Sequence, residues 1–262
     1  APPALRASRH FTSTMACESP AVNRLNDVLR LYEILAELEV RLGGARQLQA
    51  CNGRMAWPDH GVYFFFEPGE LRSTSGRGPR VVRVGTHALS ASSRTRLWTR
   101  LSQHRGTAST GAGNHRGSAF RYLVGQALIR RGRMDVPTWG VGGTATAAAE
   151  DFGISRTALL ERELPVEVAV SRMIGAMPFL WVRCEDVVGG RDARDVIERN
   201  AIGLLSNRGG QALDAPSATW LGAASPSALV RESGVWNKNY VDDGYDQRFL
   251  KVLARAARRP RL

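Results

Sequence analysis

Two residues with chemically useful side chains stand four positions apart in a segment that is predicted to be helical. Arg100 and His104 share one face of the expected helix 94–105, because residues four apart on a helix are neighbours. A guanidinium can bind a non-bridging phosphate oxygen and offset the negative charge of a transition state, and an imidazole beside it can assist a proton transfer. The alternative is that Arg100 is a solvated charge and His104 a partly packed residue at the rim of the core.

A single carboxylate interrupts the apolar face of a second expected helix, 192–206. On a helical wheel, Glu198 falls between Ile202 and Leu205. A carboxylate on an apolar face is costly unless it is paired, hydrogen-bonded or bound to a metal. A hard cation needs only one or two carboxylates beside water and substrate phosphate, so one Glu would suffice. The alternative is a buried ion pair with Arg194, one turn earlier.

The segments that must position these residues indicate a mixed α and β domain. The order strand, strand, helix, helix, strand, helix predicts an α+β fold with a small three-stranded antiparallel sheet flanked by helices. Apolar and β-branched runs give the strands, and helical periodicity gives the helices. Strands are expected at 61–66, 80–84 and 179–182, and helices at 94–105, 119–131, 155–175 (interrupted by Pro165) and 192–206.

Composition shifts divide the 262-residue chain into four parts. We expect a disordered or tag-like tail at 1–18, an N-terminal helical extension at 19–59, a central domain at 60–210 and a C-terminal extension at 211–262. The C-terminal extension is rich in aromatic and amide side chains, which we expect to pack over the core, with base stacking as the alternative. The side chains in question are Trp220, Trp236, Asn237, Asn239 and Tyr240.

The charge balance favours a polyanionic partner. Lys and Arg total 36 against 24 acidic residues, a formal net charge of +12, and Arg is well suited to phosphate. The alternative is that this basicity is only compositional. The three cysteines are scattered and form no CxxC pair, which argues against a structural zinc site and fits a reducing cytoplasm. No run of 18 apolar residues is present, so no membrane span is predicted.

An ordered set of short motifs resembles the GIY-YIG nuclease superfamily over about residues 60–210. Gly61-Val62-Tyr63 opens the first strand, and Arg83-Val84-Gly85 closes the second. The Arg100–His104 helix follows, and then the Glu198 helix after a third strand. The resemblance implies a GIY-YIG fold and a metal-dependent endonuclease that hydrolyses phosphodiester bonds in nucleic acid. It implies double-stranded DNA as the partner and Mg²⁺ or Mn²⁺ as the cofactor.

The resemblance also implies roles for individual residues. Tyr63 would orient or deprotonate the attacking water, with Arg100 and His104 assisting, and Glu198 would bind the metal. Arg83 stands where the family usually has a Tyr, and a permanently cationic side chain cannot replace a phenol in proton transfer. Arg83 could instead hold the scissile phosphate. The substitution leaves open a catalytically inactive nucleic-acid-binding protein on the same fold, and no feature separates DNA from RNA as the substrate of a nuclease.

Further side chains are candidates for contact with nucleic acid. His87 follows the second motif, and His115 and Arg116 lie in the glycine-rich loop 106–117, which could contact phosphate. Asn207 follows the Glu198 helix, where the family also has an Asn. The alternatives are an ordinary surface loop for the first three and a helix C-terminal cap for Asn207. A solvated helix face is expected for Glu161, Glu163 and Glu167.

Overall fold

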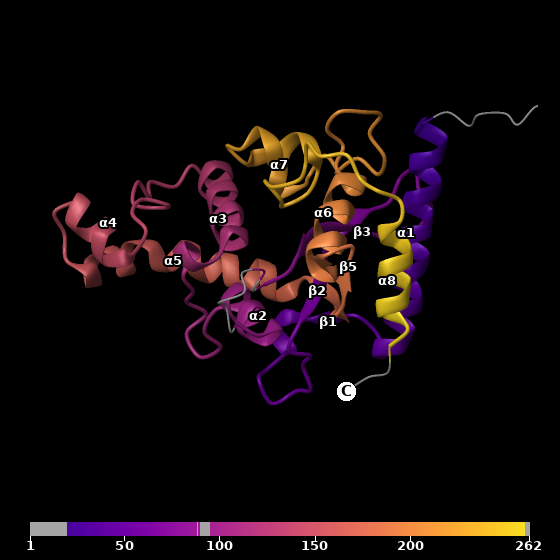
Figure 1. Cartoon of the computed structure of the whole chain (residues 1–262). Helices are drawn as coiled ribbons and strands as arrows, with labels where there is room; N and C mark the ends of the chain where they lie inside the picture. Colours follow the sequence, from indigo (N-terminus) through magenta and orange to yellow (C-terminus); the bar gives the residue numbers. More distant parts are fainter. Residues whose placement is uncertain (1–19, 88, 90–94, 260–262) are drawn as a thin grey trace, which may run out of the picture.

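A four-stranded antiparallel sheet, ordered β1-β4-β2-β3, forms the centre of the molecule. The structure is a computed structural model that describes residues 20–87, 89 and 95–259 (Figure 1). The expected tail, 1–18, therefore lies outside the described residues. The α+β class is confirmed, but the expected number of three strands is wrong, because β1 has only two residues and shows no periodic pattern. The strands are β1 (Arg46–Gln47), β2 (Gly61–Leu71), β3 (Pro79–Gly85) and β4 (Pro178–Arg183).

The apolar run at the start of β2 is buried on both faces of this sheet. Val62 and Phe64 pack in one core cluster, whereas Tyr63 and Phe65 pack in the other. Successive side chains of a strand point to opposite faces, so a run without polar alternation indicates a strand that is covered on both sides. Tyr63 pairs with Gly85 of β3, which brings the two sequence motifs side by side.

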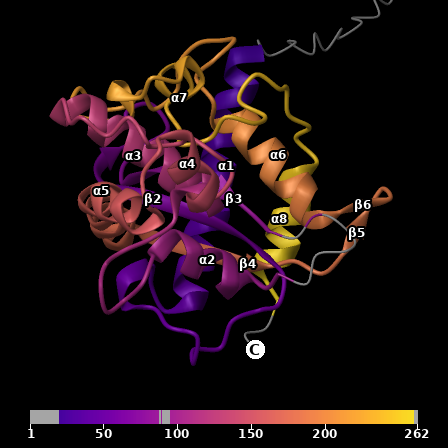
Figure 2. The ribbon, with the colours of Figure 1, turned by 90° about the vertical axis from the view of Figure 1, so that its left-hand side faces the viewer.

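Helices supply the cover on each face (Figures 1 and 2). The predicted interruption at Pro165 is wrong, because α5 continues through this residue, whose own side chain is exposed. No helix within the described ranges is long and apolar enough to cross a membrane. One layer contains α1 (Pro20–Leu42), α6 (Ala193–Leu205) and α8 (Phe249–Ala257), and the other contains α2 (Leu97–Arg105), α3 (Ala119–Gly132) and α5 (Arg156–Ala176).

Shorter elements decorate this frame. In Figure 1, α4 and the start of α5 project away from the sheet, while α7 lies near α3 and α6. The remaining elements are the helices α4 (Ala145–Asp151) and α7 (Ala228–Ser233), the 3-10 turns η1 (Leu48–Ala50), η2 (His115–Gly117) and η3 (Leu221–Ala224), and the ribbon of β5 (Val187–Val188) and β6 (Arg191–Asp192).

The first and last helices of the described chain, α1 and α8, lie side by side and run in the same direction (Figure 1). Asp27, near the start of α1, accepts hydrogen bonds from Tyr245 and Gln247, just before α8, at 2.8 and 2.6 Å. Near the other end, Arg41 donates to the carbonyl of Arg258 at 3.4 Å. These contacts fix a parallel pair.

The C-terminal part of the chain covers the free edge of β3. The backbone N–H of Trp236 donates to the carbonyl of Val82 at 2.6 Å. The Asn237 side chain binds both backbone groups of Val84, accepting from its N–H at 3.2 Å and donating to its carbonyl at 2.9 Å. Trp220 and Trp236 are buried in the core, so the expectation that they pack there is confirmed.

Candidate active site

A cleft of about 470 Å³ opens where β3 ends. Its wall includes Arg100 and Gln103 from α2, Glu198 from α6, and Thr86 and His87 from the segment that follows β3. Two of the residues singled out in the sequence, Arg100 and Glu198, therefore come together although 98 positions separate them. The cleft joins the helix layers on opposite faces of the sheet, so no local sequence pattern could show it.

Glu198 is held at the cleft by a backbone donor. The N–H of Thr86 donates to Oε1 at 3.2 Å. Among the described residues, this is the one hydrogen bond to the carboxylate. Burial raises its pKa, although the nearby charge of Arg83 and the Thr86 hydrogen bond both act to lower it. Arg194, the alternative partner, binds Asp192 and donates to the carbonyl of His87 at 2.8 Å.

Arg100 presents a guanidinium to the same cleft. Its Nη1 donates to the carbonyl of Gly117 and to the side-chain oxygen of Gln103, both at 3.0 Å. A guanidinium has five N–H donors, so these two bonds orient the group and leave donors for a ligand. The side chain is half-buried.

Tyr63 and His104 form a buried pair that does not line the cleft. The Tyr63 hydroxyl and His104 Nε2 are 2.8 Å apart, and His104 Nδ1 lies 2.8 Å from the hydroxyl of Ser118. Both side chains are fully buried. The rim position that was the alternative for His104 is therefore wrong. Burial, reinforced by nearby arginines, holds the pKa of His104 well below its ordinary value, so the imidazole is neutral.

The glycines of the two motifs are explained by close packing. A Cβ atom added to Gly85 would lie 2.4 Å from the Tyr63 hydroxyl oxygen. One added to Gly61 would lie 2.6 Å from the carbonyl oxygen of Val182. Only glycine leaves space for the phenol at the end of β3, one residue before Thr86 enters the cleft wall.

Arg83 is buried and does not line the cleft. Its Nη1 donates to the carbonyl of Trp236, and its guanidinium lies over the ring of Phe120, 5.4 Å from the centroid. In this position its charge opposes the burial that raises the pKa of Glu198. This arrangement does not offer the expected contact between Arg83 and a phosphate, because the side chain is buried and absent from the cleft wall.

His87 stands in the cleft wall beside Glu198's backbone partner. Its Nδ1 lies 2.7 Å from the carbonyl oxygen of Thr95. Burial lowers the pKa of His87 to about 4, with the charge of Arg194 acting in the same direction, so the ring is neutral near pH 7.

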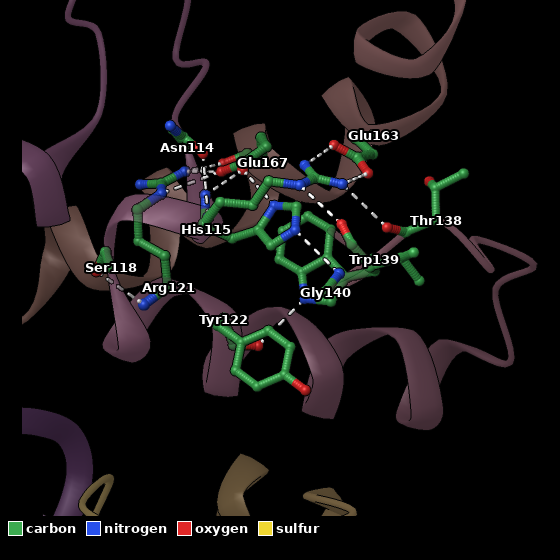
Figure 3. Close-up of polar contacts among 12 residues, drawn as sticks. Asn114, His115, Ser118, Arg121, Tyr122, Thr138, Trp139, Gly140, Glu163 and Glu167 are labelled. Atoms are coloured by element: carbon green, nitrogen blue, oxygen red, sulfur yellow. Dashed lines mark hydrogen bonds and ion pairs between the residues drawn. The ribbon is translucent and has the colours of Figure 1, made fainter. Parts of the chain in front are cut away.

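Arg116 is anchored inside the protein rather than offered to a ligand, and its partners Glu163 and Thr138 are labelled in Figure 3. It pairs with Glu163 at 2.7 Å and donates to the carbonyls of Val141 and Thr138 at 3.0 and 3.1 Å. Both charged side chains are almost fully buried. The expected phosphate contact of Arg116 and the expected solvation of Glu163 are therefore wrong, because the two residues neutralise each other in the core.

His115 belongs to the same buried network. Its Nδ1 donates to Glu167 at 2.9 Å, while Nε2 accepts from the N–H of Gly140 at 3.0 Å. Arg121 also pairs with Glu167. Burial acts to raise the pKa of Glu167, but the bonds from His115 and Arg121 outweigh it and lower that pKa. His115 is thus unavailable to nucleic acid, and the solvated position expected for Glu167 is wrong.

Asn207 lies outside the cleft wall. Its side-chain oxygen accepts from the N–H of Leu213 at 2.9 Å, and its own N–H donates to the carbonyl of Ser233. These bonds close the loop after α6. Among the cleft residues that the sequence did not reveal, Thr86 and Gly117 contribute backbone groups, for which side-chain patterns give no signal.

The residues at the cleft fit a hard divalent cation held mainly by non-protein ligands. Within the described ranges, no group of three or more His, Cys, Asp or Glu side chains could enclose a metal ion. Glu198 nevertheless offers a carboxylate with one hydrogen bond in an open, polar cleft. This donor set suits a cation that keeps several waters and binds substrate phosphate.

A family model described as the GIY-YIG domain matches residues 22–261. No curated protein and no solved structure matches the chain.

Proposed function

The chain belongs to the GIY-YIG family, and from this premise we propose that it is a metal-dependent endonuclease that hydrolyses phosphodiester bonds in double-stranded DNA. The family is one of nucleases that act on nucleic acid. The observation that carries the finer proposal is the cleft in which Glu198 of α6 faces Arg100 of α2. One group suits a divalent cation and the other suits a phosphate.

Glu198 is the residue that would hold the cation. When bound, Mg²⁺ or Mn²⁺ would stabilise negative charge on the phosphate and on the leaving oxygen. The Thr86 N–H fixes one carboxylate oxygen, and Arg83 counteracts the effect of burial on the pKa of Glu198. Arg83 therefore supports the ionised ligand from within the protein.

Arg100 would bind a non-bridging oxygen of the scissile phosphate. Its guanidinium is already oriented by the Gly117 carbonyl and Gln103. A preorganised charge of this kind stabilises the transition state without having to rearrange at the moment of reaction.

The Tyr63–His104 pair would orient the attacking water. The phenol oxygen lies against Gly85, next to the cleft wall, and 2.8 Å from the neutral His104. Ser118 holds the far side of the imidazole. A phenol that donates its proton to a fixed, uncharged imidazole keeps its oxygen lone pairs for a hydrogen bond from the attacking water, and so can orient that water once substrate brings it to the site.

A plasmid-nicking assay tests the proposal. We expect nicking by the wild type with Mg²⁺ or Mn²⁺ and none with EDTA. Glu198→Gln should abolish nicking, Arg100→Gln should slow it about 10²- to 10³-fold, and Tyr63→Phe about 10²- to 10⁴-fold. Matched controls are Glu161→Gln and Arg96→Gln, whose side chains are exposed and outside the cleft.

Alternative outcomes separate the competing functions. Cleavage of single-stranded RNA but not of plasmid would replace the DNA substrate. Salt-sensitive binding without cleavage of any substrate would favour a binding-only protein. Arg83→Tyr would then be the variant in which to look for cleavage. Undiminished nicking by Glu198→Gln would remove Glu198 from the reaction.

A further inference from the structure

His87 carries a buried nitrogen that nothing in the described structure uses. The carbonyl oxygen of Thr95, 2.7 Å from Nδ1, can only accept a hydrogen bond, so the proton must sit on Nδ1. Nε2 is then the nitrogen with the lone pair. It is buried and has no hydrogen-bond partner among the described residues. A buried acceptor without a partner is costly and calls for a ligand.

The position of this ring is fixed from several sides. His60 lies parallel to it, with 5.8 Å between the ring centroids and an interplanar angle of 3°. The backbone on either side is attached to α6, since Arg194 binds the carbonyl of His87 and Glu198 accepts from the N–H of Thr86. The imidazole and the Glu198 carboxylate are therefore positioned by the same helix and line the same cleft.

The hydrogen-bond pattern is that of a metal-binding histidine. Such residues usually donate the N–H of one ring nitrogen to a carbonyl or carboxylate, which orients the other nitrogen toward the cation. His87 has this arrangement with Thr95. Its low pKa means that no proton competes for the lone pair near pH 7.

We propose that His87 Nε2 and Glu198 together bind the divalent cation, as a mixed nitrogen and oxygen site. The inference rests on the proposed function only in taking Glu198 as the shared ligand. Imidazole is a poor ligand for Mg²⁺ but a good one for Mn²⁺ and later transition metals. The site therefore takes Mn²⁺ in preference to Mg²⁺, with water and phosphate completing the coordination shell.

Pulsed electron paramagnetic resonance of bound Mn²⁺ tests the assignment directly. The full chain is loaded with Mn²⁺ alone and then with a phosphorothioate DNA duplex, which resists cleavage. We expect a nitrogen coupling in the echo modulation, and labelling of histidine with ¹⁵N should change its pattern. Competition should show that Mn²⁺ binds at least about tenfold more tightly than Mg²⁺.

Two substitutions assign the nitrogen. His87→Gln keeps an N–H for the Thr95 carbonyl but offers no ring nitrogen, so the coupling should vanish and Mn²⁺ binding should weaken about 10- to 100-fold. Mg²⁺ binding should change much less. His60→Gln is the matched control, since His60 is the neighbouring ring, and it should keep the coupling. Circular dichroism confirms that each variant is folded.

The results separate this inference from the nuclease proposal. Bound Mn²⁺ without histidine coupling, coupling that survives His87→Gln, or no Mn²⁺ binding by the wild type would each overturn it. Coupling that depends on His87, in a protein that nicks no nucleic acid, would support the metal site and contradict the nuclease proposal. Nicking that depends on Glu198, without the coupling, would support the nuclease proposal and contradict the role of His87.

Discussion

Gly85 leaves the space that the Tyr63 phenol occupies. Its Cα faces the Tyr63 phenol so closely that a methyl group would lie 2.4 Å from the hydroxyl oxygen. Gly85→Ala should lower the free energy of unfolding by about 1–3 kcal/mol through overpacking, and it should displace the hydroxyl from His104. Urea denaturation measures the first effect and nicking rates the second. Gly143→Ala is the control, because a Cβ there meets nothing within 4 Å; equal losses in the two variants would contradict the packing argument.

Glu198 illustrates the conflict between function and stability. Burial raises its pKa in the folded protein, so the folded state favours the protonated form. The stability linked to this group is present in acid and is lost as pH rises through the folded pKa. Glu198→Gln should therefore increase the free energy of unfolding at neutral pH by roughly 0.5–2 kcal/mol.

The pH dependence of that gain is the check. Urea denaturation of both proteins from about pH 4 to about pH 8 should show the difference growing with pH, since only the wild type acquires the buried charge. A difference that is constant with pH would mean that the carboxylate is not destabilised by burial. Both proteins are kept free of cations and their unfolding is followed by circular dichroism, because a bound cation would hide the effect.

At the scale of elements, the buried ion pair between Arg116 and Glu163 ties the glycine-rich loop to α5. Arg116→Leu should lower the free energy of unfolding by about 3–5 kcal/mol, because it leaves Glu163 buried without its partner. The double variant with Glu163→Leu should recover much of this loss. Additive losses in the double-mutant cycle, measured by urea denaturation, would contradict the pairing.

The edge of β3 gives a second prediction at this scale. Asn237→Leu should leave the N–H and carbonyl of Val84 unpaired under the C-terminal segment, which lowers the free energy of unfolding by about 2–3 kcal/mol. Hydrogen exchange at the Val84 amide should become faster. Asn239→Leu, at an exposed position nearby, is the control. An unchanged exchange rate in Asn237→Leu would show that the edge is closed by other contacts.

Contacts within elements were predictable from sequence, and contacts between distant elements were not. The run at 61–66 predicts a strand, and helical spacing places Arg100 and His104 on one helix. His115 and Arg116, however, find their carboxylates on α5, about 50 residues further along the chain. From sequence alone, a flexible loop beside a charged helix has the same pattern as a solvated surface. Burial alone distinguishes the two.

For the site, the sequence indicated the chemistry of the residues but not how deeply each side chain is buried. Glu198 stood out because a carboxylate interrupts an apolar face, and the structure places it at the cleft. The sequence did not show that Tyr63 and Arg83 are buried, because the burial of a phenol or a guanidinium depends on which distant segments of the chain cover it. The cover of Arg83 comes from Trp236, 153 residues away.

At the scale of the whole molecule, the net charge of +12 overstates what nucleic acid can contact. Among the described residues, Arg100 lines the cleft, and Arg105 and Arg172 line a hollow of about 260 Å³ beside α2. If each displaces one counterion, the logarithm of the DNA affinity should fall with log salt at a slope of about −3, not about −11.

Fluorescence anisotropy at several salt concentrations measures this slope. Arg172→Ala should make it shallower by about 1. Arg30→Ala should leave it unchanged, because Arg30 lies on α1, whose packing face covers the other side of the sheet. A slope near the value set by the full net charge would mean that the molecule binds nucleic acid over its entire surface.

The parallel packing of α1 and α8 has a mechanical consequence. The start of α1 and the end of α8 lie at opposite ends of the pair (Figure 1). A pull on these two ends loads the helices in shear, so that the contacts along their length must break together rather than one after another. The direction in which force reaches the protein would thus decide how well it resists extension.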